Sequence, residues 1–528
     1  MNILGINKNH NSSVALFNDH KLIYYNQEER LSRIKRDSFF PIKCLEQVKK
    51  LNVKIDKVIM TGYDTEGDTE LFGVLKKLNL VETGNCFHYY KSHHITHAAK
   101  ALYSSGFKDA LIFVYDGRGS NYTLENGQNA YETLSVYLAK QPFSFDCKYK
   151  KLLSPSEGEN KKVLHNSTPL SLNSKTIFEV SSYDSLCPLY THVSGYIGFN
   201  NDNEGKTMGL RAYGGGNGIV KNILYKKDLF HTQYDLNNKY QIREDPKVIA
   251  FEVQRIFENT FKEVLNKFKD LNKNIILTGG GALNILNNYK VLKYIKDTHN
   301  LYVDPMCGDE GNSIGAALLY LQQNNPKDFF KINDIYLGPK PKLKKTLKTE
   351  PNTINHLLNK KIVALFQGRA EGGPRALGNR SLLFDPRVKN GKDIVNKVKK
   401  REWFRPFGCS VLEEEAHKWF DMQGLKESPH MLYGVQCLPD KKDLIPSVVH
   451  ADNSCRIQTV NEKQNKVLYD ILKQFYKKTK VPILLNTSFN LSNEPLVETQ
   501  EEAIDVFTRS DIDVLYFPEI KEEIKKWI

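Results

Sequence analysis

Residues 362–405 read IVALFQGRAEGGPRALGNRSLLFDPRVKNGKDIVNKVKKREWFR, a short apolar strand followed by arginines and lysines set among glycines and prolines. The cationic residues follow no apolar period that would make them one solvated helix face. Arginine matches a carboxylate or phosphate through two parallel hydrogen bonds, and glycines let backbone amides approach the same oxygens. The stretch therefore predicts an anion pocket in a small α/β domain, with a basic surface loop as the alternative.

The rest of the chain is too long to share one core with this stretch. A chain of 528 residues is expected to form two or more domains. The lysine-rich run PKPKLKKTLKTE after Gly338 predicts a linker, which gives domains at 1–345 and 355–528. In the first domain, the turns TGGGALN and GDEGN each follow a strand and lead into a helix. This repetition indicates a duplicated, two-lobed ATPase of the actin and hexokinase type.

The composition favours an anionic partner, because the formal charge is +14 and the pI is near 9.0. Basic runs occur at RLSRIKR, FSFDCKYKK, GENKK and PKLKKTLK. The eight cysteines form no C-x-x-C pair, so neither structural zinc nor a disulfide framework is expected, and a reducing cytoplasm is predicted. The sequence shows neither a signal-peptide pattern nor an apolar run long enough to span a bilayer, so no membrane association is expected.

A metal site is suggested by His93 and His97, which stand four apart in a helical stretch and so project from one face. Asp116 follows an apolar strand, and Asp309 lies in a glycine turn before a helix. Two imidazoles and two carboxylates suit iron, manganese or zinc, and we expect iron. The alternative is a pair of ordinary surface histidines.

The glycine turns DGRGS, TGGGALN and GDEGN predict an adenylate site in the first domain, since glycines expose amides to phosphate and helix N-termini add positive potential. The candidate residues are Gly117, Gly119, Ser120, Gly279, Gly280, Gly281 and Asn284. His10, in the turn HNSS, is the candidate general base; a structural role is the alternative. No Gly-x-Ser-x-Gly elbow supports acyl-enzyme chemistry.

In the second domain, cationic side chains are expected to neutralise a compact dianion and the triphosphate of ATP; these are Arg375, Arg380, Lys399, Arg405 and Arg456. Asn486, Thr487 and Ser488 follow an apolar strand and are candidate neutral donors, although one of them could instead cap a helix. The run RLSRIKR, residues 30–36, fits a solvated helix start as well as a role at the acceptor or nucleotide.

Several runs carry a family resemblance: GGPRALGNRSLLFDPR, VKKREWFRPF, HADNSCRIQTV and VPILLNTSFNLSNEP, preceded by HNSSVALF, HHITHAA, VYDGRGS and EGKTMGLRAYG. The chain resembles the O-carbamoyltransferases of antibiotic and nodulation-factor biosynthesis. The resemblance implies a divalent metal at His93, His97, Asp116 and Asp309, in a domain like the universal tRNA threonylcarbamoyl-transfer ATPase. It also implies carbamoyl phosphate at Lys399 and Arg405, in a domain of the threonylcarbamoyl-adenylate-synthase type.

The expected activity is formation of carbamoyl-adenylate from carbamoyl phosphate and ATP with Mg²⁺, and carbamoyl transfer to an acceptor hydroxyl. His10, Lys399 and Arg405 are the expected catalytic residues. A small molecule or sugar is the favoured acceptor, with hydroxymethylated pyrimidines in DNA as the alternative. Threonylcarbamoyl modification of tRNA and a non-enzymatic nucleotide-sensing module are the competing functions. A homodimer is left open.

Overall fold

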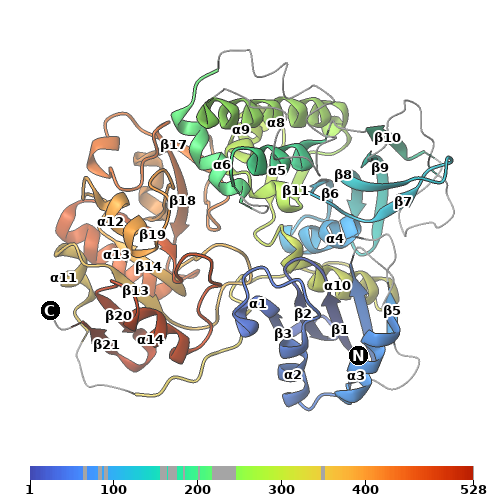
Figure 1. Cartoon of the computed structure of the whole chain (residues 1–528), viewed down its shortest axis with the longest axis horizontal. Coiled ribbons are helices and arrows are strands. Elements are labelled where there is room, and N and C mark those ends of the chain that lie inside the picture. Colours follow the sequence, from blue (N-terminus) through green and yellow to red (C-terminus); the bar gives the residue numbers. More distant parts are fainter. Residues whose placement is uncertain are drawn as a thin grey trace.

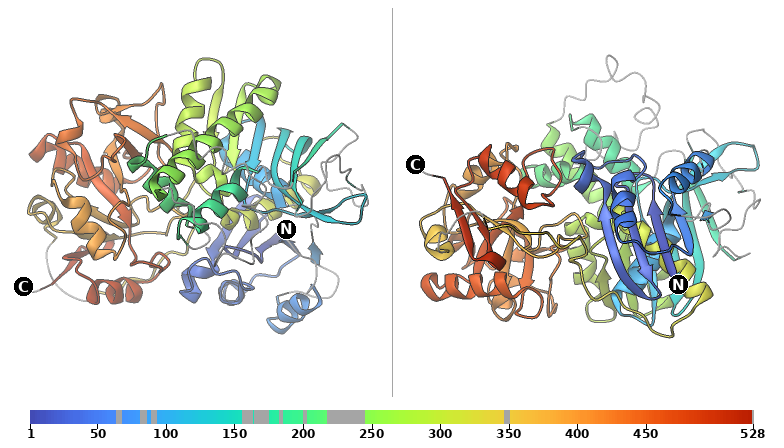
Figure 2. Two further views of the ribbon diagram at one scale, coloured as in Figure 1. Left: turned by 45° about the horizontal axis from the view of Figure 1, so that its top comes forward. Right: turned by 90° about the horizontal axis from the view of Figure 1, so that it is seen from below.

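The computed structural model describes residues 1–62, 68–80, 86–88, 93–154, 163, 175–181, 185–199, 203–216, 245–345 and 351–526. Two bodies lie side by side, the N-terminal one built from the blue-to-yellow part of the chain and the C-terminal one from the orange-to-red part (Figure 1). The connecting segment crosses between them, as Figure 2 shows from below. Among the described helices, none is both long and apolar enough to cross a membrane.

The first sheet of the N-terminal body has the strand order β3-β2-β1-β4-β5. Its strands are β1 (Asn2–Asn7), β2 (Ser13–Asn18), β3 (Lys21–Gln27), β4 (Lys57–Thr61) and β5 (Cys86–His88). Strand β2 is antiparallel to both β1 and β3, whereas β4 is parallel to β1 and β5.

The second sheet repeats this arrangement as β9-β8-β6-β11-β12. Its strands are β6 (Asp109–Tyr115), β8 (Asn129–Lys140), β9 (Ser144–Leu153), β11 (Asn274–Thr278) and β12 (Asn300–Val303). Again β8 is antiparallel to β6 and β9, and β11 is parallel to β6 and β12. Strands β7 (Asn121–Thr123) and β10 (Ile177–Ser181) extend it. The equal order and direction confirm the predicted duplication.

Two buried helices lie between the sheets, α4 (His93–Ser105) and α10 (Asn312–Asn324). Both are buried along most of their length, as expected of helices packed on more than one side. At their crossing, a Cβ on Gly315 would come within 2.0 Å of the Thr96 carbonyl oxygen, so only glycine allows this approach. The packing fixes the start of α10 against α4.

Further helices cover the outer faces. On the first sheet these are α1 (Glu28–Ser32), α2 (Ile42–Lys50) and α3 (Asp68–Lys77); on the second they are α5 (Leu186–Tyr196), α6 (Glu204–Leu210), α8 (Pro246–Phe268) and α9 (Ile285–Ile295). Helix α8 begins where the sequence favours it: Pro246 occupies the first turn, and the Asp245 side chain accepts a hydrogen bond from the amide of Lys247.

The C-terminal body is a mixed sheet of order β16-β17-β18-β15-β19-β14-β13-β20-β21. The strands are β13 (Val363–Phe366), β14 (Arg380–Phe384), β15 (Gly408–Leu412), β16 (Phe420–Asp421), β17 (Gly434–Cys437), β18 (Ser454–Val460), β19 (Ile483–Ser488), β20 (Val514–Phe517) and β21 (Glu522–Lys525). The helices are α11 (Thr353–Leu358), α12 (Gly391–Val398), α13 (Lys466–Thr479) and α14 (Gln500–Thr508). The predicted apolar strands at 363–366 and 483–488 are interior strands and are almost fully buried. The predicted linker lies partly outside the described residues.

Candidate functional site

The predicted metal ligands lie together at the centre of the N-terminal body. His93 Nε2 lies 3.1 Å from Asp116 Oδ2 and 3.3 Å from Asp309 Oδ1. His97 Nε2 lies 3.5 Å from Asp116 Oδ2, 3.2 Å from Asp309 Oδ1 and 3.2 Å from His93 Nε2. Two atoms bound to one ion at about 2.1 Å can be at most about 4.2 Å apart. Each of these separations is shorter than that, so the donors fit one cation.

The fold delivers these four side chains from three places. The histidines come from the first turns of α4, Asp116 from the end of β6, and Asp309 from the turn before α10. All four are buried. Burial lowers the pKa of His93, but the carboxylates of Asp309 and Asp116 outweigh it and raise that pKa to about 10. In this environment a proton and a divalent cation compete for the same imidazole nitrogens.

Asp116 is oriented by amides of both glycine turns. Its Oδ1 accepts hydrogen bonds from Gly117 N at 2.8 Å and Gly280 N at 3.2 Å, which leaves Oδ2 facing the histidines. A Cβ on Gly280 would lie 2.8 Å from Oδ1. In this structure the amides of Gly117 and Gly280 hold the Asp116 carboxylate, and their role in nucleotide binding stays a prediction.

The neighbouring turn residues are engaged as well. Gly119 N donates to the Glu132 carbonyl at 2.8 Å, and Ser120 N donates to the Glu132 carboxylate at 3.2 Å. Ser120 Oγ accepts a hydrogen bond from the amide of His93 at 3.2 Å, and the amide of His94 donates to Glu132. Gly119 and Ser120 thus support the first turn of α4, and their predicted role at a nucleotide stays a prediction.

Glu132 was not predicted as a site residue. It is fully buried on β8, and it forms an ion pair with the buried Lys150. Burial opposes ionisation, but His94 and Lys150 lower the pKa of Glu132 to about 2. A glutamate inside the alternating apolar strand AYETLSVYLA was the available signal.

The remaining residues of the TGGGALN turn have packing and capping roles. A Cβ on Gly279 would meet the Tyr115 carbonyl oxygen at 2.4 Å, and one on Gly281 would meet the Tyr115 ring at 2.4 Å. The Asn284 side chain caps α9 at the amide of Asn287 and pairs with Gln254. Asn284 thus caps a helix in this structure, and its role in nucleotide binding stays a prediction.

His10 lies beside the metal centre, in the turn between β1 and β2. The amide nitrogen of the Asn7 side chain donates to the carbonyl oxygens of His10, at 3.2 Å, and Asp309, at 3.1 Å. His10 itself is half-buried. The shared contact with Asn7 places the His10 backbone near the turn that carries Asp309, and its role as a base stays a prediction.

The predicted cationic side chains of the C-terminal body divide into two groups. Arg380 is fully buried, with Nη1 donating to the Gln367 carbonyl at 2.6 Å and Nε to the Val497 carbonyl at 3.1 Å; its guanidinium stacks on Phe366. Arg380 therefore stabilises the sheet, and its predicted contact with an anion is wrong. Arg369 and Arg387 are likewise engaged with carbonyls and with a carboxylate.

The second group is the cationic cluster, consisting of Arg375, Lys399, Arg401, Arg405 and Arg456. Burial, followed by the charges of Arg375, Arg401 and Arg405, lowers the pKa of Arg456. Burial and Arg405 lower the pKa of Arg401 to about 9. Cations held this close favour a bound anion over an empty site.

Two members of the cluster carry polar atoms without a partner. Nε of Arg375 and Nε of Arg456 are buried and make no hydrogen bond within the described part of the chain. The same is true of Oδ1 of Asn486, whose Nδ2 donates to Ser410 and Gln458. Buried donors are normally satisfied, so these atoms mark a place for a polar ligand.

Lys399 lies at the edge of this cluster and is fully buried. Its Nζ donates to the Ser488 carbonyl, to the Asn490 carbonyl at 2.8 Å and to Asn490 Oδ1 at 2.9 Å. Ser488 Oγ donates to Asn490 Oδ1, and Thr487 lies within β19. Of the three predicted neutral donors, Ser488 thus shares its surroundings with Lys399, and Asn486 lies nearer to Arg456 through the pairing of β15 with β18 and β19.

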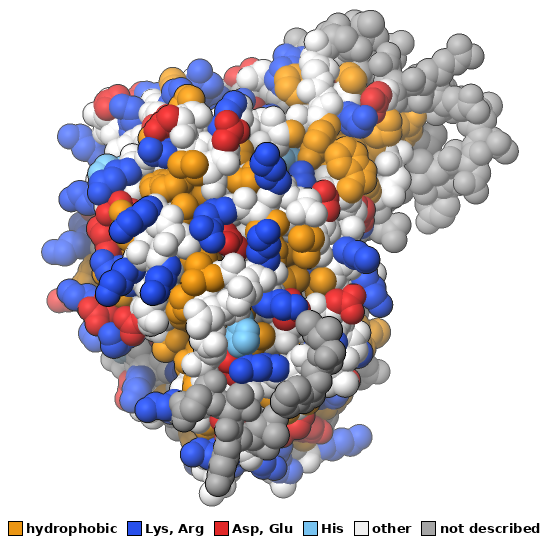
Figure 3. Space-filling model, turned by 90° about the vertical axis from the view of Figure 1, so that its left-hand side faces the viewer, with side chains coloured by type: hydrophobic (Ala, Val, Ile, Leu, Met, Phe, Trp, Pro, Cys, Tyr) orange, Lys and Arg blue, Asp and Glu red, His pale blue; other side chains and the backbone are white. Residues whose placement is uncertain are grey.

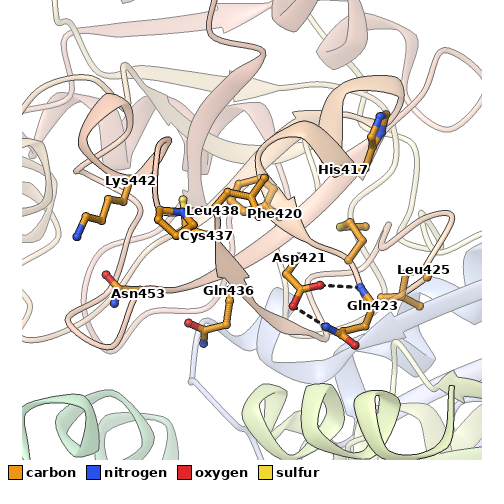
Figure 4. A pocket seen from close by; sticks show the side chains of 13 residues that line it. His417, Phe420, Asp421, Gln423, Leu425, Gln436, Cys437, Leu438, Lys442 and Asn453 are labelled. Atoms are coloured by element: carbon orange, nitrogen blue, oxygen red, sulfur yellow. Dashed lines mark hydrogen bonds between the residues drawn. The ribbon is translucent and has the colours of Figure 1, made fainter.

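One cavity lies apart from both the candidate metal ligands and the cationic cluster. Its volume is about 780 Å³, and it opens at β16 and β17, with Phe420, Asp421, Gln436 and Cys437 on its wall (Figure 4). None of the predicted site residues lines it. The four candidate metal ligands and the cationic cluster are the chemically distinctive sites.

Comparisons with known proteins agree with this arrangement. A family model described as carbamoyltransferase C-terminus matches residues 354–522, and one described as carbamoyltransferase N-terminus matches 72–270 and 226–318. The uncharacterized protein MJ1058 of Methanocaldococcus jannaschii is 32% identical over 80% of this chain and 72% of its own length. Nodulation protein NolNO of Sinorhizobium fredii is 28% identical over 96% of this chain and 78% of its own.

Nodulation protein NolO of Bradyrhizobium diazoefficiens is 30% identical over 80% of this chain and 77% of its own length. Among solved structures, HypF of T. kodakarensis aligns with a TM-score of 0.34 and 14% identity over 62% of this chain and 49% of its own, a likeness too distant to carry an argument. The duplicated α/β body and the separate mixed-sheet body define a two-domain transferase. The chain belongs to the carbamoyltransferase family, and it is an enzyme.

Proposed function

We propose that this carbamoyltransferase forms carbamoyl-adenylate at the cationic cluster and transfers the carbamoyl group to an acceptor hydroxyl at the metal centre. The observation that carries the proposal is the pair of distinct centres in one molecule. One gathers cations around unsatisfied buried donors, and the other gathers His93, His97, Asp116 and Asp309. The cationic cluster suits a polyanionic carbamoyl donor, and the four metal-binding side chains suit a substrate oxygen that a cation polarises.

In the first half-reaction, Arg375, Arg405 and Arg456 bind the phosphates of ATP and carbamoyl phosphate. Water releases orthophosphate from carbamoyl phosphate and leaves carbamate. A carbamate oxygen then forms a bond to the α-phosphorus of ATP while the bond from that phosphorus to the bridging oxygen breaks. Pyrophosphate leaves with the electron pair, and the cations stabilise its growing charge.

In the second half-reaction, the acceptor oxygen attacks the carbamoyl carbon, and AMP leaves with its oxygen. His10 takes the hydroxyl proton, a role that suits an imidazole near neutral pH. A divalent ion held by His93, His97, Asp116 and Asp309 would supply Lewis-acid stabilisation of the developing charge. Glu132, with Ser120 between it and His93, orients the first turn of α4.

A small hydroxylated molecule or sugar is the favoured acceptor, because the lysines of one described basic run are paired with carboxylates. In the run 143–151, Lys148, Lys150 and Lys151 are paired with Asp146, Glu132 and Glu179. On the face in Figure 3, Lys and Arg are mixed with acidic and apolar side chains. The run GENKK lies outside the described residues.

The deciding experiment incubates the purified chain with ATP, Mg²⁺, carbamoyl phosphate and a panel of hydroxylated acceptors. Mass spectrometry should detect a gain of one carbamoyl group on an acceptor, and pyrophosphate should appear only when carbamoyl phosphate is present. Replacing carbamoyl phosphate by threonine and bicarbonate tests the threonylcarbamoyl alternative. ATP binding with no pyrophosphate from any donor would instead support a nucleotide-sensing module.

A further inference from the structure

The segment Arg33–Arg36, which follows α1 in the N-terminal domain, lies against the C-terminal domain. Arg33 and Arg36 both adopt left-handed backbone conformations, with φ of 65° and 56°. The amide of Arg36 donates to Glu29 Oε2 at 2.8 Å, which closes the turn. The result is a compact turn that carries Lys35 and Arg36 at its tip.

Hydrogen bonds across the domain boundary fix this turn. Arg33 Nη1 donates to the Leu496 carbonyl at 2.7 Å, and Nη2 to the Pro495 carbonyl at 3.1 Å. Arg33 also lies 3.2 Å from Glu502. Just before the turn, Gln27 Nε2 donates to the Gly372 carbonyl at 2.7 Å. The turn is therefore held at both ends by residues of the C-terminal domain.

The anchoring loop leads directly to the cationic cluster. Asn490 Nδ2 donates to the Glu494 carbonyl at 2.6 Å, and Asn490 accepts from Lys399. The turn therefore lies beside the loop that binds Lys399. Burial lowers the pKa of Lys399, and the charges of Arg401 and Lys35 lower it further. The charge of Arg36 likewise acts on Arg405.

These contacts place more positive charge at the site than the C-terminal domain supplies. The described carboxylates that offset it are Glu29, Glu310, Glu402 and Glu494. A phosphate monoester carries only about −1.5 to −2 at pH 7, so a single such group would leave the enlarged cluster under-neutralised. A polyphosphate is the ligand whose charge matches it.

We propose that Lys35 and Arg36 of the N-terminal domain complete the anion site and bind the polyphosphate part of ATP that leaves as pyrophosphate. The proposal rests on the proposed function for the reaction it serves. It makes adenylate formation dependent on docking of the two domains, since the C-terminal domain alone lacks these cations. Lys35 and Arg36 thereby become determinants for the nucleotide and its leaving group.

The test is calorimetric binding of inorganic pyrophosphate to the full chain and to Lys35→Ala, Arg36→Ala and the double variant. A hydrogen bond to a charged group is worth about 1.5–3 kcal/mol, so each single variant should bind about tenfold to a hundredfold more weakly. Lys49→Ala, an exposed change on α2, is the matched control and should bind as the unchanged chain does. Lys35→Arg should retain most of the affinity for pyrophosphate. An unchanged Tm in all variants shows that the fold is intact.

Equal pyrophosphate affinity in the unchanged chain and the double variant would overturn the inference. Carbamoyl-phosphate-dependent pyrophosphate release is measured in parallel on the same proteins. Loss of affinity in the variants supports the inference even if the unchanged chain releases no pyrophosphate, a result that would count against the proposed function alone. Normal release together with equal affinity would count against the inference alone.

Discussion

The hydroxyl of Tyr25 lies 3.1 Å from the carbonyl oxygen of Gly372 and also 2.9 Å from the carbonyl oxygen of Glu310. One side chain thus contacts both the turn that carries Asp309 and the glycine loop that leads to Arg375. Gly373 reinforces this contact, because a Cβ there would lie 2.4 Å from the Pro305 carbonyl oxygen. The two centres are therefore held in a fixed relation by backbone atoms of both domains.

Replacing His97 by Ala should empty the metal centre. Three ligand side chains would remain, and the second imidazole would no longer lie between the two carboxylates. The metal content of the purified protein should therefore fall at least about tenfold. Elemental analysis of the purified protein measures this directly. Carbamoyl transfer should be lost while pyrophosphate release persists. His417→Ala, an exposed histidine in the other domain, is the control, and equal metal content in both variants would contradict the site.

Arg405→Ala should block carbamoyl-phosphate-dependent pyrophosphate release. Arg405 is half-buried, and its described carboxylate neighbour, Glu402, is 3.5 Å away, so its guanidinium remains able to bind phosphate. Losing such a contact should cost about 2–5 kcal/mol, or roughly 30-fold to several thousand-fold in rate. Lys400→Ala changes an exposed cation in the same segment and should leave release intact. Similar rates for both variants would remove Arg405 from the anion site.

Arg380→Ala should act on stability. The change leaves the carbonyls of Gln367 and Val497 buried without their donor and removes the stacking on Phe366. At about 1–3 kcal/mol for each unsatisfied group, the free energy of unfolding should fall by about 3–5 kcal/mol. Urea denaturation measures this. A variant that unfolds at the same urea concentration but has lost nucleotide binding would restore Arg380 to the ligand site.

Pyrophosphate affinity should fall as pH rises through about 8. Desolvation, with the charges of Arg36, Arg401 and Arg405 and against that of Glu29, lowers the pKa of Lys35 to about 8. Below this pH Lys35 is already a cation and attracts the anion; above it, binding must first take up a proton. Lys35→Ala should lack this step. Calorimetry from pH 7 to about 9.5 on both proteins separates the titration of Lys35 from the protonation of pyrophosphate itself. If the affinity of both proteins changed with pH in parallel, the role assigned to Lys35 would be contradicted.

The sequence indicated the four candidate metal ligands through local signals and through the family resemblance. The i, i+4 histidine pair and the strand-to-turn aspartates follow from element type alone, and duplication of the sheet then brings them together. The hydrogen-bond partners of the glycine amides could not be predicted in the same way. Whether an amide faces phosphate or a neighbouring carboxylate depends on Asp116, which lies far in sequence from Gly280.

The arginines of residues 362–405 show the same limit. Arg380 and Arg405 have similar glycine- and proline-rich surroundings in sequence, yet one is satisfied by the carbonyl of Val497 and the other remains accessible. The two arginines differ only because the segment 495–498, distant in sequence, supplies backbone carbonyls to Arg380. That same segment anchors Arg33, which is why the run at 30–36 could not be distinguished from a solvated helix start.

The spread of the metal ligands along the chain has a consequence for biosynthesis. His93, His97 and Asp116 leave the ribosome well before Asp309, and the amide of Gly280 that orients Asp116 also emerges later. Domains generally fold as units during synthesis, and a preformed metal site rarely exists in an unfolded chain. A nascent chain halted after residue 116 but before residue 309 would therefore carry two histidines and one aspartate without the fourth ligand. Loading of an ion at the proposed site becomes a late event, because it requires ligands from both lobes.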